Sequence, residues 1–316
     1  MAKNTNTDQI RQLTNRVHLA GALAELEVKT GNDKNGTAYI SLQGAVQCGE
    51  TPVHTVRFRS YVPSKKSDGT DSKNYPKVVE WANKAVPMTK NKDNCTFVDM
   101  VGSITDNPYV ASDGTLVESY QYNITLFNNF TDYAAEIDVE GFVHSIVDET
   151  KGEEGNATGR KRMRLITRDF FGNTMDLKNI IVPKDLVEAL EDNDYEKGCT
   201  ATFFINLIPN QKEVVVKKGG IGAQRTTEGR SYLENILVGA DPVVDPESEN
   251  ALDAKVIKNA MNERKTRLDE IKDKGYQGGT SNKTATTTTA SRNGIGNTKS
   301  DASKVEAVDD DEEFPF

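Results

Sequence analysis

Apolar and polar residues alternate along much of the chain between residues 17 and 130, as they do in β-strands, whose successive side chains point to opposite faces of a sheet. Five stretches of this kind are predicted to be strands: residues 17–29, 37–48, 55–61, 96–105 and 120–130. Between the third and the fourth, residues 77–86 carry apolar side chains at helical spacing directly after Pro76. The predicted order is therefore three strands, one helix and two strands.

The same order recurs in the second half of the chain. The strands predicted there are residues 134–147, 161–168, 174–182, 200–207 and 231–238. We expect the first of these to be broken at Gly141 and to be followed by a charged loop that reaches Gly159. Residues 183–190 open with a proline and are helix-like, so a helix again falls between the third and fourth strands.

This order of elements resembles that of the OB-fold, a five-stranded barrel known for binding oligonucleotides. The resemblance implies an all-β chain with tandem OB-fold-like barrels at residues 16–131 and 132–245, after a flexible N-terminus at residues 1–15. The connection before the last strand of the second barrel is long and contains a further strand-like run at residues 213–217. In an OB-fold, the corresponding loop often grips nucleic acid.

Residues 246–274 are predicted to contain an amphipathic helix, because apolar residues recur at helical spacing between charges from residue 251 onward. This helix either packs on the barrels or pairs with a second copy of the chain. Residues 275–307 are mostly Gly, Ser, Thr and Asn and cannot bury a core, which predicts a disordered linker. Residues 308–316 form an acidic tip.

The chain is acidic, with a formal net charge of -9 at pH 7. From residue 275 onward seven acidic residues accompany four basic ones, so the part before it is acidic as well. Binding to a polyanion must therefore depend on local basic patches. No apolar run is long enough to span a bilayer and the N-terminus is polar, so we expect no membrane partner and a cytoplasmic protein, within a bacterial host if the chain is phage-encoded.

Two strands place basic residues and an aromatic residue on one face. Alternation collects Arg57, Arg59 and Tyr61 opposite Val56 and Phe58. In the second barrel it collects Arg162, Arg164, Arg168 and Phe170 opposite Met163 and Leu165. Because cationic side chains neutralise phosphates and rings stack on bases at ~1–3 kcal/mol each, both faces are candidate nucleic-acid sites. The alternative is two solvated sheet faces. The predicted nucleic-acid-binding residues are Tyr39, Arg57, Arg59, Tyr61, Lys65, Lys66, Tyr75, Lys77, Arg160, Arg162, Arg164, Arg168, Phe170, Phe171, Lys217, Lys218, Arg225 and Arg230.

The sequence carries no motif for catalysis, a metal or a cofactor. It has no G-x-x-x-x-G-K-[ST] loop, no H-E-x-x-H and no paired cysteines, and the glycine-rich residues 219–222 lack a following helix. The three histidines lie in strand-like segments, with no cluster of carboxylates or cysteines around them in the sequence. This predicts structural roles for His18, His54 and His144. We therefore expect a non-enzymatic protein that needs no cofactor and no metal.

The C-terminus carries the most specific local signal: Asp309, Asp310, Asp311, Glu312, Glu313, Phe314, Pro315 and Phe316. A terminal phenylalanine on a flexible tether offers a ring and a carboxylate to a pocket with a basic rim, and the acidic residues steer the encounter. This end resembles the tip of bacterial and phage single-stranded-DNA-binding proteins, which finish in an acidic run followed by Pro-Phe. Phe314 replaces the usual aliphatic residue of the bacterial tip, and the tandem body exceeds the single bacterial barrel, so the resemblance is to phage-type members. The alternative is an ordinary solubilising tail.

The resemblance implies a protein that coats single-stranded DNA irrespective of sequence during DNA replication, recombination and repair. Its tip would recruit a helicase, primase, polymerase or nuclease. Two alternatives stay open: a scaffold that gathers replication enzymes without binding DNA, and an RNA-binding OB protein. Oligonucleotide binding as a function of salt, with DNA and RNA strands of equal length, separates the three.

The acidic residues and the terminal ring of the tip should have separable effects. Deleting residues 309–316 should tighten single-stranded-DNA binding modestly at low salt, because a tethered polyanion no longer competes for the basic faces, and added salt should remove the gain. Deleting Phe316 alone should leave DNA affinity unchanged and abolish pull-down of replication or repair enzymes from host extract. Capture that survives loss of Phe316 and disappears only when the acidic residues are neutralised would mark the tip as a generic charged tail.

Overall fold

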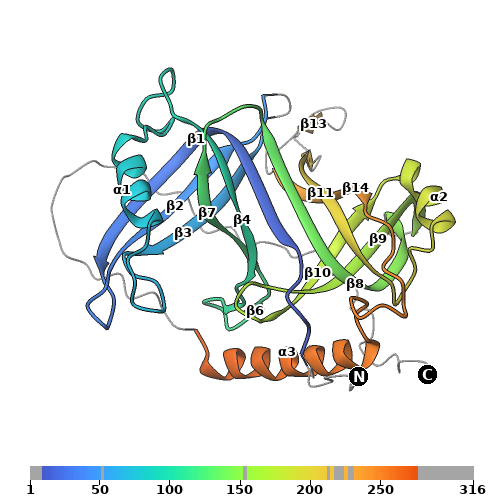
Figure 1. Cartoon of the computed structure of the whole chain (residues 1–316). Helices are drawn as coiled ribbons and strands as arrows, with labels where there is room; N and C mark the ends of the chain where they lie inside the picture. Colours follow the sequence, from blue (N-terminus) through green and yellow to red (C-terminus); the bar gives the residue numbers. More distant parts are fainter. Residues whose placement is uncertain are drawn as a thin grey trace. The chain divides into compact units, whose positions relative to one another are not determined.

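A computed structural model describes residues 9–50, 53–151, 155–211, 214–216, 224–226 and 231–276 of the chain. Within this part the chain forms two β-barrels that share one continuous sheet, with a long helix running along them (Figure 1).

The first barrel consists of β1 (Asn15–Asn32), β2 (Ala38–Gln47), β3 (Thr55–Pro63), β4 (Phe97–Asp106) and β7 (Tyr120–Asn128). Its strands are hydrogen-bonded in the order β1-β2-β3-β7-β4, and β4 pairs back with β1 to close the barrel. The pairing of β3 with β7 is parallel. Helix α1 (Asn74–Lys84) lies between β3 and β4, so the predicted OB-fold-like barrel is confirmed.

The second barrel repeats this arrangement with β8 (Ala134–Lys151), β9 (Asn156–Arg168), β10 (Thr174–Val182), β11 (Thr200–Gln211) and β14 (Ser231–Ala240). β11 closes it by pairing with β8, and the pairing of β10 with β14 is parallel. Helix α2 (Lys184–Asp192) again connects the third strand to the fourth. Two short hairpins extend the barrels, β5 (Tyr109–Val110) with β6 (Leu116–Val117) and β12 (Val214–Val216) with β13 (Gln224–Thr226).

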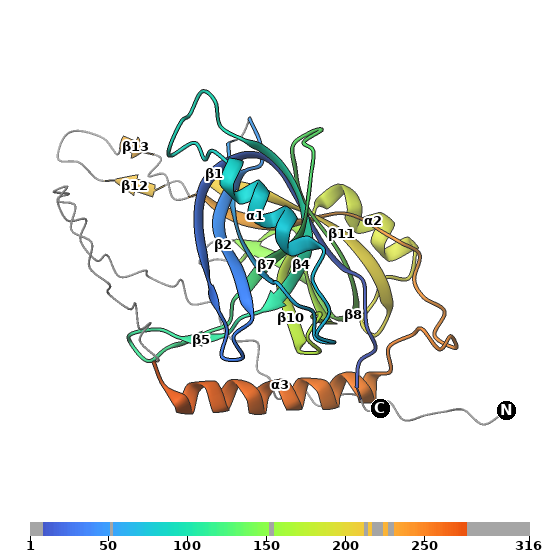
Figure 2. The ribbon, with the colours of Figure 1, turned by 60° about the vertical axis from the view of Figure 1, so that its left-hand side comes forward.

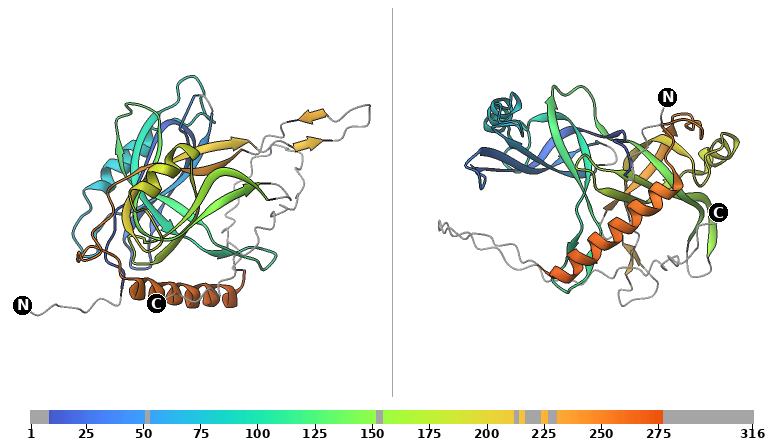
Figure 3. Two further views of the ribbon diagram at one scale, coloured as in Figure 1. Left: turned by 90° about the vertical axis from the view of Figure 1, so that its right-hand side faces the viewer. Right: turned by 60° about the horizontal axis from the view of Figure 1, so that its bottom comes forward.

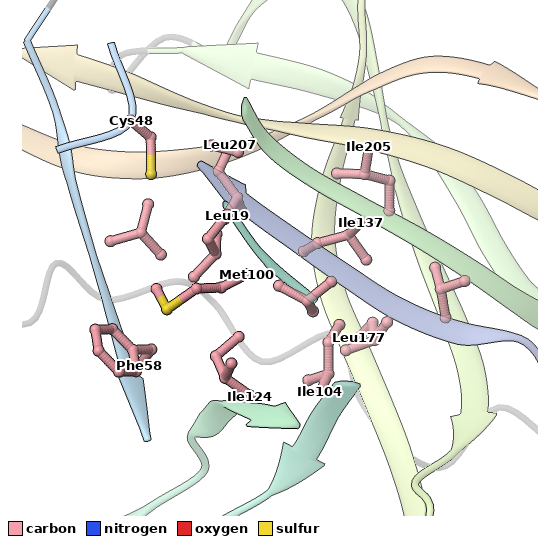
Figure 4. Packing of buried hydrophobic residues seen from close by; sticks show 14 of the residues in the cluster. Leu19, Cys48, Phe58, Met100, Ile104, Ile124, Ile137, Leu177, Ile205 and Leu207 are labelled. Atoms are coloured by element: carbon pink, nitrogen blue, oxygen red, sulfur yellow. The ribbon is translucent and has the colours of Figure 1, made fainter. Parts of the chain in front are cut away.

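The two barrels are joined through β1, which is antiparallel to β8 over Asn15 to Ala20. Buried apolar side chains of both barrels form one cluster, including Leu19 of β1, Met100 of β4 and Ile137 of β8 (Figure 4). Burying these side chains away from water stabilises the barrels together. The two predicted barrels therefore share a core.

Local boundaries differ from the expectation at several points. β8 is not broken at Gly141 but runs without interruption from Ala134 to Lys151. Glycine at this position lets β9 approach closely, since an added Cβ would lie 3.0 Å from the carbonyl oxygen of Ile166. β9 begins at Asn156, so the predicted charged loop up to residue 159 is wrong. Pro76 lies inside the first turn of α1 rather than before it, where its missing N–H costs no helical hydrogen bond. The β5–β6 hairpin was not predicted.

Helix α3 (Ala254–Lys274) lies within the predicted segment 246–274 and starts three residues after residue 251, where the helical spacing begins. Asp253 caps it by accepting hydrogen bonds from the backbone N–H groups of Lys255 and Val256. The helix packs within the chain, as one of the two expected arrangements (Figures 2 and 3). Its first half buries Ile257 and Ala260 against Phe142 of the second barrel and the N-terminal segment. None of the helices in the described residues is long and apolar enough to cross a membrane.

The second half of α3 is fastened to the first barrel by charges. Asp106, at the end of β4, has a fully buried side chain and is paired with both Arg264 and Arg267. Arg264, whose side chain is 3% exposed, also pairs with Glu118 at 2.8 Å, just after β6. A buried cation left without its partner is strongly unfavourable, so these pairs require the helix to remain in place.

Replacing Asp106 by Ala should therefore lower the free energy of unfolding by about 3–5 kcal/mol, because among the described residues it leaves buried Arg264 with Glu118 as its one anionic partner. Urea denaturation of the full chain measures this change. The control is Glu80→Ala, which breaks an ion pair between the exposed side chains of Glu80 and Lys84 and should leave the midpoint unchanged. Equal urea midpoints for Asp106→Ala and the wild type would show that the pairing does not hold α3.

Candidate nucleic-acid interface

The outer face of β3 carries the cationic and aromatic residues predicted from its alternation. Arg57, Arg59 and Tyr61 are exposed, whereas Val56 and Phe58 are buried. Arg57 makes no hydrogen bond or ion pair with any residue in the described ranges. Arg59 makes a single long contact there, 3.5 Å from its Nη1 to Oε1 of Gln121. Both guanidinium groups therefore have donors available for an external anion.

Two tyrosines stand beside these arginines. The ring centroids of Tyr39 and Tyr61 are 5.1 Å apart, and Tyr61 is 52% exposed. Tyr39 lies over Gly31 of the neighbouring strand, where an added Cβ would lie 3.0 Å from the tyrosine hydroxyl. Partial burial and the nearby charge of Asp33 raise the pKa of Tyr61, so its phenol is neutral near pH 7. The two rings together offer an aromatic surface for base stacking.

The other residues predicted for the first barrel differ in their exposure. Lys65 and Lys66 are exposed in the turn after β3, and Lys77 is exposed on α1. Tyr75 instead packs half-buried against the core, because α1 begins at Asn74 and so includes this residue. Its geometry is that of a packing residue.

The predicted arginines of the second barrel do share a face, but carboxylates from neighbouring strands hold them. Arg164 makes two hydrogen bonds to Asp176 of β10, at 2.8 and 2.9 Å. Arg160 and Arg162 both bond to Glu149 of β8. Because Glu149 and Asp176 are 3% and 1% exposed, each forms a buried anchor beneath the guanidinium groups.

Glu149 is ionised in the folded protein. Burial alone would raise its pKa, but hydrogen bonds from Arg160 and Thr158 and the charges of Arg160 and Arg162 outweigh burial, so its pKa is lowered. In return, the hydrogen bond to Glu149 raises the pKa of Arg160. Both shifts favour the charged forms of Glu149 and Arg160.

The turn between β9 and β10 presents the two predicted phenylalanines. Phe170 and Phe171 are 72% and 68% exposed, with ring centroids 5.8 Å apart in an edge arrangement. Buried Asp169 fixes the turn by accepting hydrogen bonds from the backbone and side-chain N–H groups of Asn173. Arg168 donates to the carbonyl oxygen of Ile10 at 2.6 Å, so it fastens the N-terminal segment.

One exposed ring of the second barrel was missed. Tyr232 of β14 is 48% exposed, and its hydroxyl lies 3.3 Å from Glu234. Glu234 in turn lies 3.8 Å from Arg160. The only signal in the sequence was an aromatic residue at the start of the predicted last strand. The remaining predictions stay untested: Arg225 belongs to β13, whose side chains are not described, and Lys217, Lys218, Arg230 and residues 309–316 lie outside the described residues.

A second aromatic cluster lies where the barrels join and differs in its charges. Phe97 contacts Phe130 and Tyr133, with ring centroids 4.9 and 6.2 Å away. The Tyr133 hydroxyl donates to Glu50 at 3.2 Å, so a carboxylate borders this cluster. That surface is less suited to a polyanion than the face of β2 and β3.

His18 corrects the expectation that no histidine has carboxylates around it. Its Nε2 lies 3.2 Å from Asp99 of β4, and its Nδ1 lies 3.4 Å from Glu136 of β8. The carboxylates bind opposite nitrogens of the ring, so the three side chains do not surround a common point. No group of side chains suited to a metal ion occurs among the described residues.

Comparisons with known proteins give one family and a set of distant structures. The YorF family model matches residues 14–274. The wild-type single-stranded DNA binding protein from Thermus aquaticus is similar in structure with a TM-score of 0.46 and 12% identity, covering 76% of this chain and 97% of that one. A deletion mutant of the same protein gives a TM-score of 0.46 and 13% identity, covering 76% and 100%. No curated protein matches the chain.

The lowered pKa of Glu149 predicts a pH dependence. Replacing Glu149 by Gln should lower the free energy of unfolding by about 2 kcal/mol at neutral pH. The charged carboxylate that accepts hydrogen bonds from Arg160 and Arg162 is then replaced by a neutral amide, which is a weaker acceptor. This difference should be complete above the ordinary glutamate pKa of 4.5 and shrink as the pH falls through the lowered folded-state pKa, where the wild type also loses the charge. Urea denaturation of both proteins between pH 7 and pH 3 measures it. A difference that stays constant over this range would contradict the assignment.

Proposed function

The chain belongs to the YorF family, and we propose that it binds single-stranded DNA irrespective of sequence through the outer face of β2 and β3. The observation that carries this proposal is the pairing of two available guanidinium groups, Arg57 and Arg59, with the adjacent ring pair of Tyr39 and Tyr61. In OB-folds the face of the second and third strands is a surface for oligonucleotides.

The chemistry of this face suits a single strand. Arginine neutralises backbone phosphates, which every sequence presents, and a neutral tyrosine stacks on any exposed base at ~1–3 kcal/mol. A duplex would hide its bases from Tyr39 and Tyr61. Because the chain as a whole is acidic, binding of the strand would depend on local basic faces such as this one.

The proposed role is to coat exposed DNA during phage-type replication, recombination and repair. The supporting feature is the acidic tip with its terminal Phe316, which would recruit a helicase, primase, polymerase or nuclease. The protein would act by binding and presenting the strand, without catalysis of its own.

The double variant Arg57→Ala/Arg59→Ala tests the proposal. It should weaken binding to every sequence alike, and the slope of log affinity against log salt should fall by about 1.4, because each phosphate contact to a single strand contributes ~0.7. Fluorescence anisotropy with mixed-sequence oligonucleotides measures both quantities. Because neither arginine is buried, the urea midpoint should stay unchanged.

The matched control removes two cations elsewhere, Arg16→Ala/Lys265→Ala, and should bind as the wild type does. Wild-type affinity in the Arg57→Ala/Arg59→Ala variant would exclude this face. If the wild type binds no oligonucleotide at low salt, the chain is a scaffold. If RNA of equal length displaces DNA, it is an RNA-binding protein.

A further inference from the structure

The arginines of the second barrel are held in a way that a plain surface ion pair does not require. Glu149 lies beneath them with a side chain that is 3% exposed. Its Oε2 accepts hydrogen bonds from Thr158 at 2.8 Å and from Nε of Arg160 at 2.5 Å, and its Oε1 accepts one from Nη2 of Arg162 at 2.8 Å. A single buried carboxylate thus orients two guanidinium groups.

Both guanidinium groups keep donors toward solvent. The side chains of Arg160 and Arg162 are 33% and 40% exposed. Arg162 uses Nη1 for Asn179 at 3.2 Å, whereas its Nε makes no hydrogen bond to any described residue. The Nη groups of Arg160 likewise make none there, since Glu234 is 3.8 Å away. Each arginine therefore has N–H donors for a further anion.

An aromatic ring completes the arrangement. Tyr232 is half exposed on β14, and its hydroxyl lies 3.3 Å from Glu234, which itself pairs with Arg160. Exposed cationic donors beside an exposed ring are the combination that recognises a phosphate and its base. The first barrel has the same combination at Arg59 and Tyr61, but there no buried carboxylate orients the arginines among the described residues.

We propose that Arg160 and Arg162 form a second phosphate-binding site for single-stranded DNA, with Tyr232 as its stacking ring and Glu149 as the residue that positions both arginines. This inference rests on the proposed function. Glu149 acts through the arginines and does not touch the strand. Because Glu149 holds the side chains of Arg160 and Arg162 in place before the strand binds, less conformational entropy is lost on binding.

The proposal makes a prediction opposite to simple electrostatics. Removing a negative charge from a face that binds a polyanion should tighten binding. Glu149→Gln should instead weaken it by about tenfold, the loss of roughly one charge-assisted hydrogen bond, because the arginines lose their orientation. Glu234→Gln removes the same charge from the same face. Glu234 lies 3.8 Å from Arg160, too far to orient it by a hydrogen bond, and a glutamine there keeps an oxygen that can accept from the Tyr232 hydroxyl, so this variant should tighten binding.

Fluorescence anisotropy of the full chain, with a thymine oligonucleotide long enough to cross both barrels, measures whether each of the two variants binds more weakly or more tightly than the wild type. Opposite effects of the two variants support the positioning role, and tighter binding by both overturns it. A second measurement removes the arginines themselves. Arg160→Ala/Arg162→Ala should weaken binding, and adding Glu149→Gln to this variant should have no further effect, because Glu149 acts through the two arginines. Wild-type affinity in that arginine variant also overturns the inference. Failure of the wild type to bind at all would instead remove the proposed function.

Discussion

β1 is hydrogen-bonded along both edges over the same stretch, and the arrangement of the whole molecule depends on this. From Val17 to Ala20 it pairs with β4, which closes the first barrel, and with β8, which begins the second. The two barrels therefore share one sheet and one apolar core, and α3 adds a second connection through Asp106, Arg264 and Arg267. With the barrels joined in this way, the faces of β2–β3 and β9–β10 hold a defined relation to one another.

The two faces use arginine differently. On β3 the guanidinium groups of Arg57 and Arg59 stand with few partners among the described residues, so they can respond to an incoming phosphate. On β9 the guanidinium groups are anchored by Glu149 and Asp176, which reduces their net charge but fixes their geometry. The first arrangement favours electrostatic attraction, and the second favours an ordered contact. Under the proposed function, the two arrangements together would let an acidic chain bind a polyanion at local basic faces.

Periodicity predicted the barrels and the faces, but not the partners of the side chains. Alternation is a local property of one strand, so it correctly placed Arg57, Arg59 and Arg162 outward. It contains no information on Glu149 or Asp176, because strand pairing brings these carboxylates from other strands. The carboxylates beside His18 were missed for the same reason, since Asp99 and Glu136 come from β4 and β8. Helical spacing found α3, whereas its fastening to Asp106 depends on contacts about 160 residues apart in the chain.

The central claim is that the strand lies on the face of β2 and β3, and photo-crosslinking tests it most directly. A thymine oligonucleotide bound to the full chain is irradiated, and mass spectrometry identifies the crosslinked aromatic residues. The account predicts crosslinks at Tyr39 or Tyr61, because their rings form the stacking surface beside Arg57 and Arg59. Crosslinks confined to the Phe97, Phe130 and Tyr133 cluster, with none at Tyr39 or Tyr61, would contradict it.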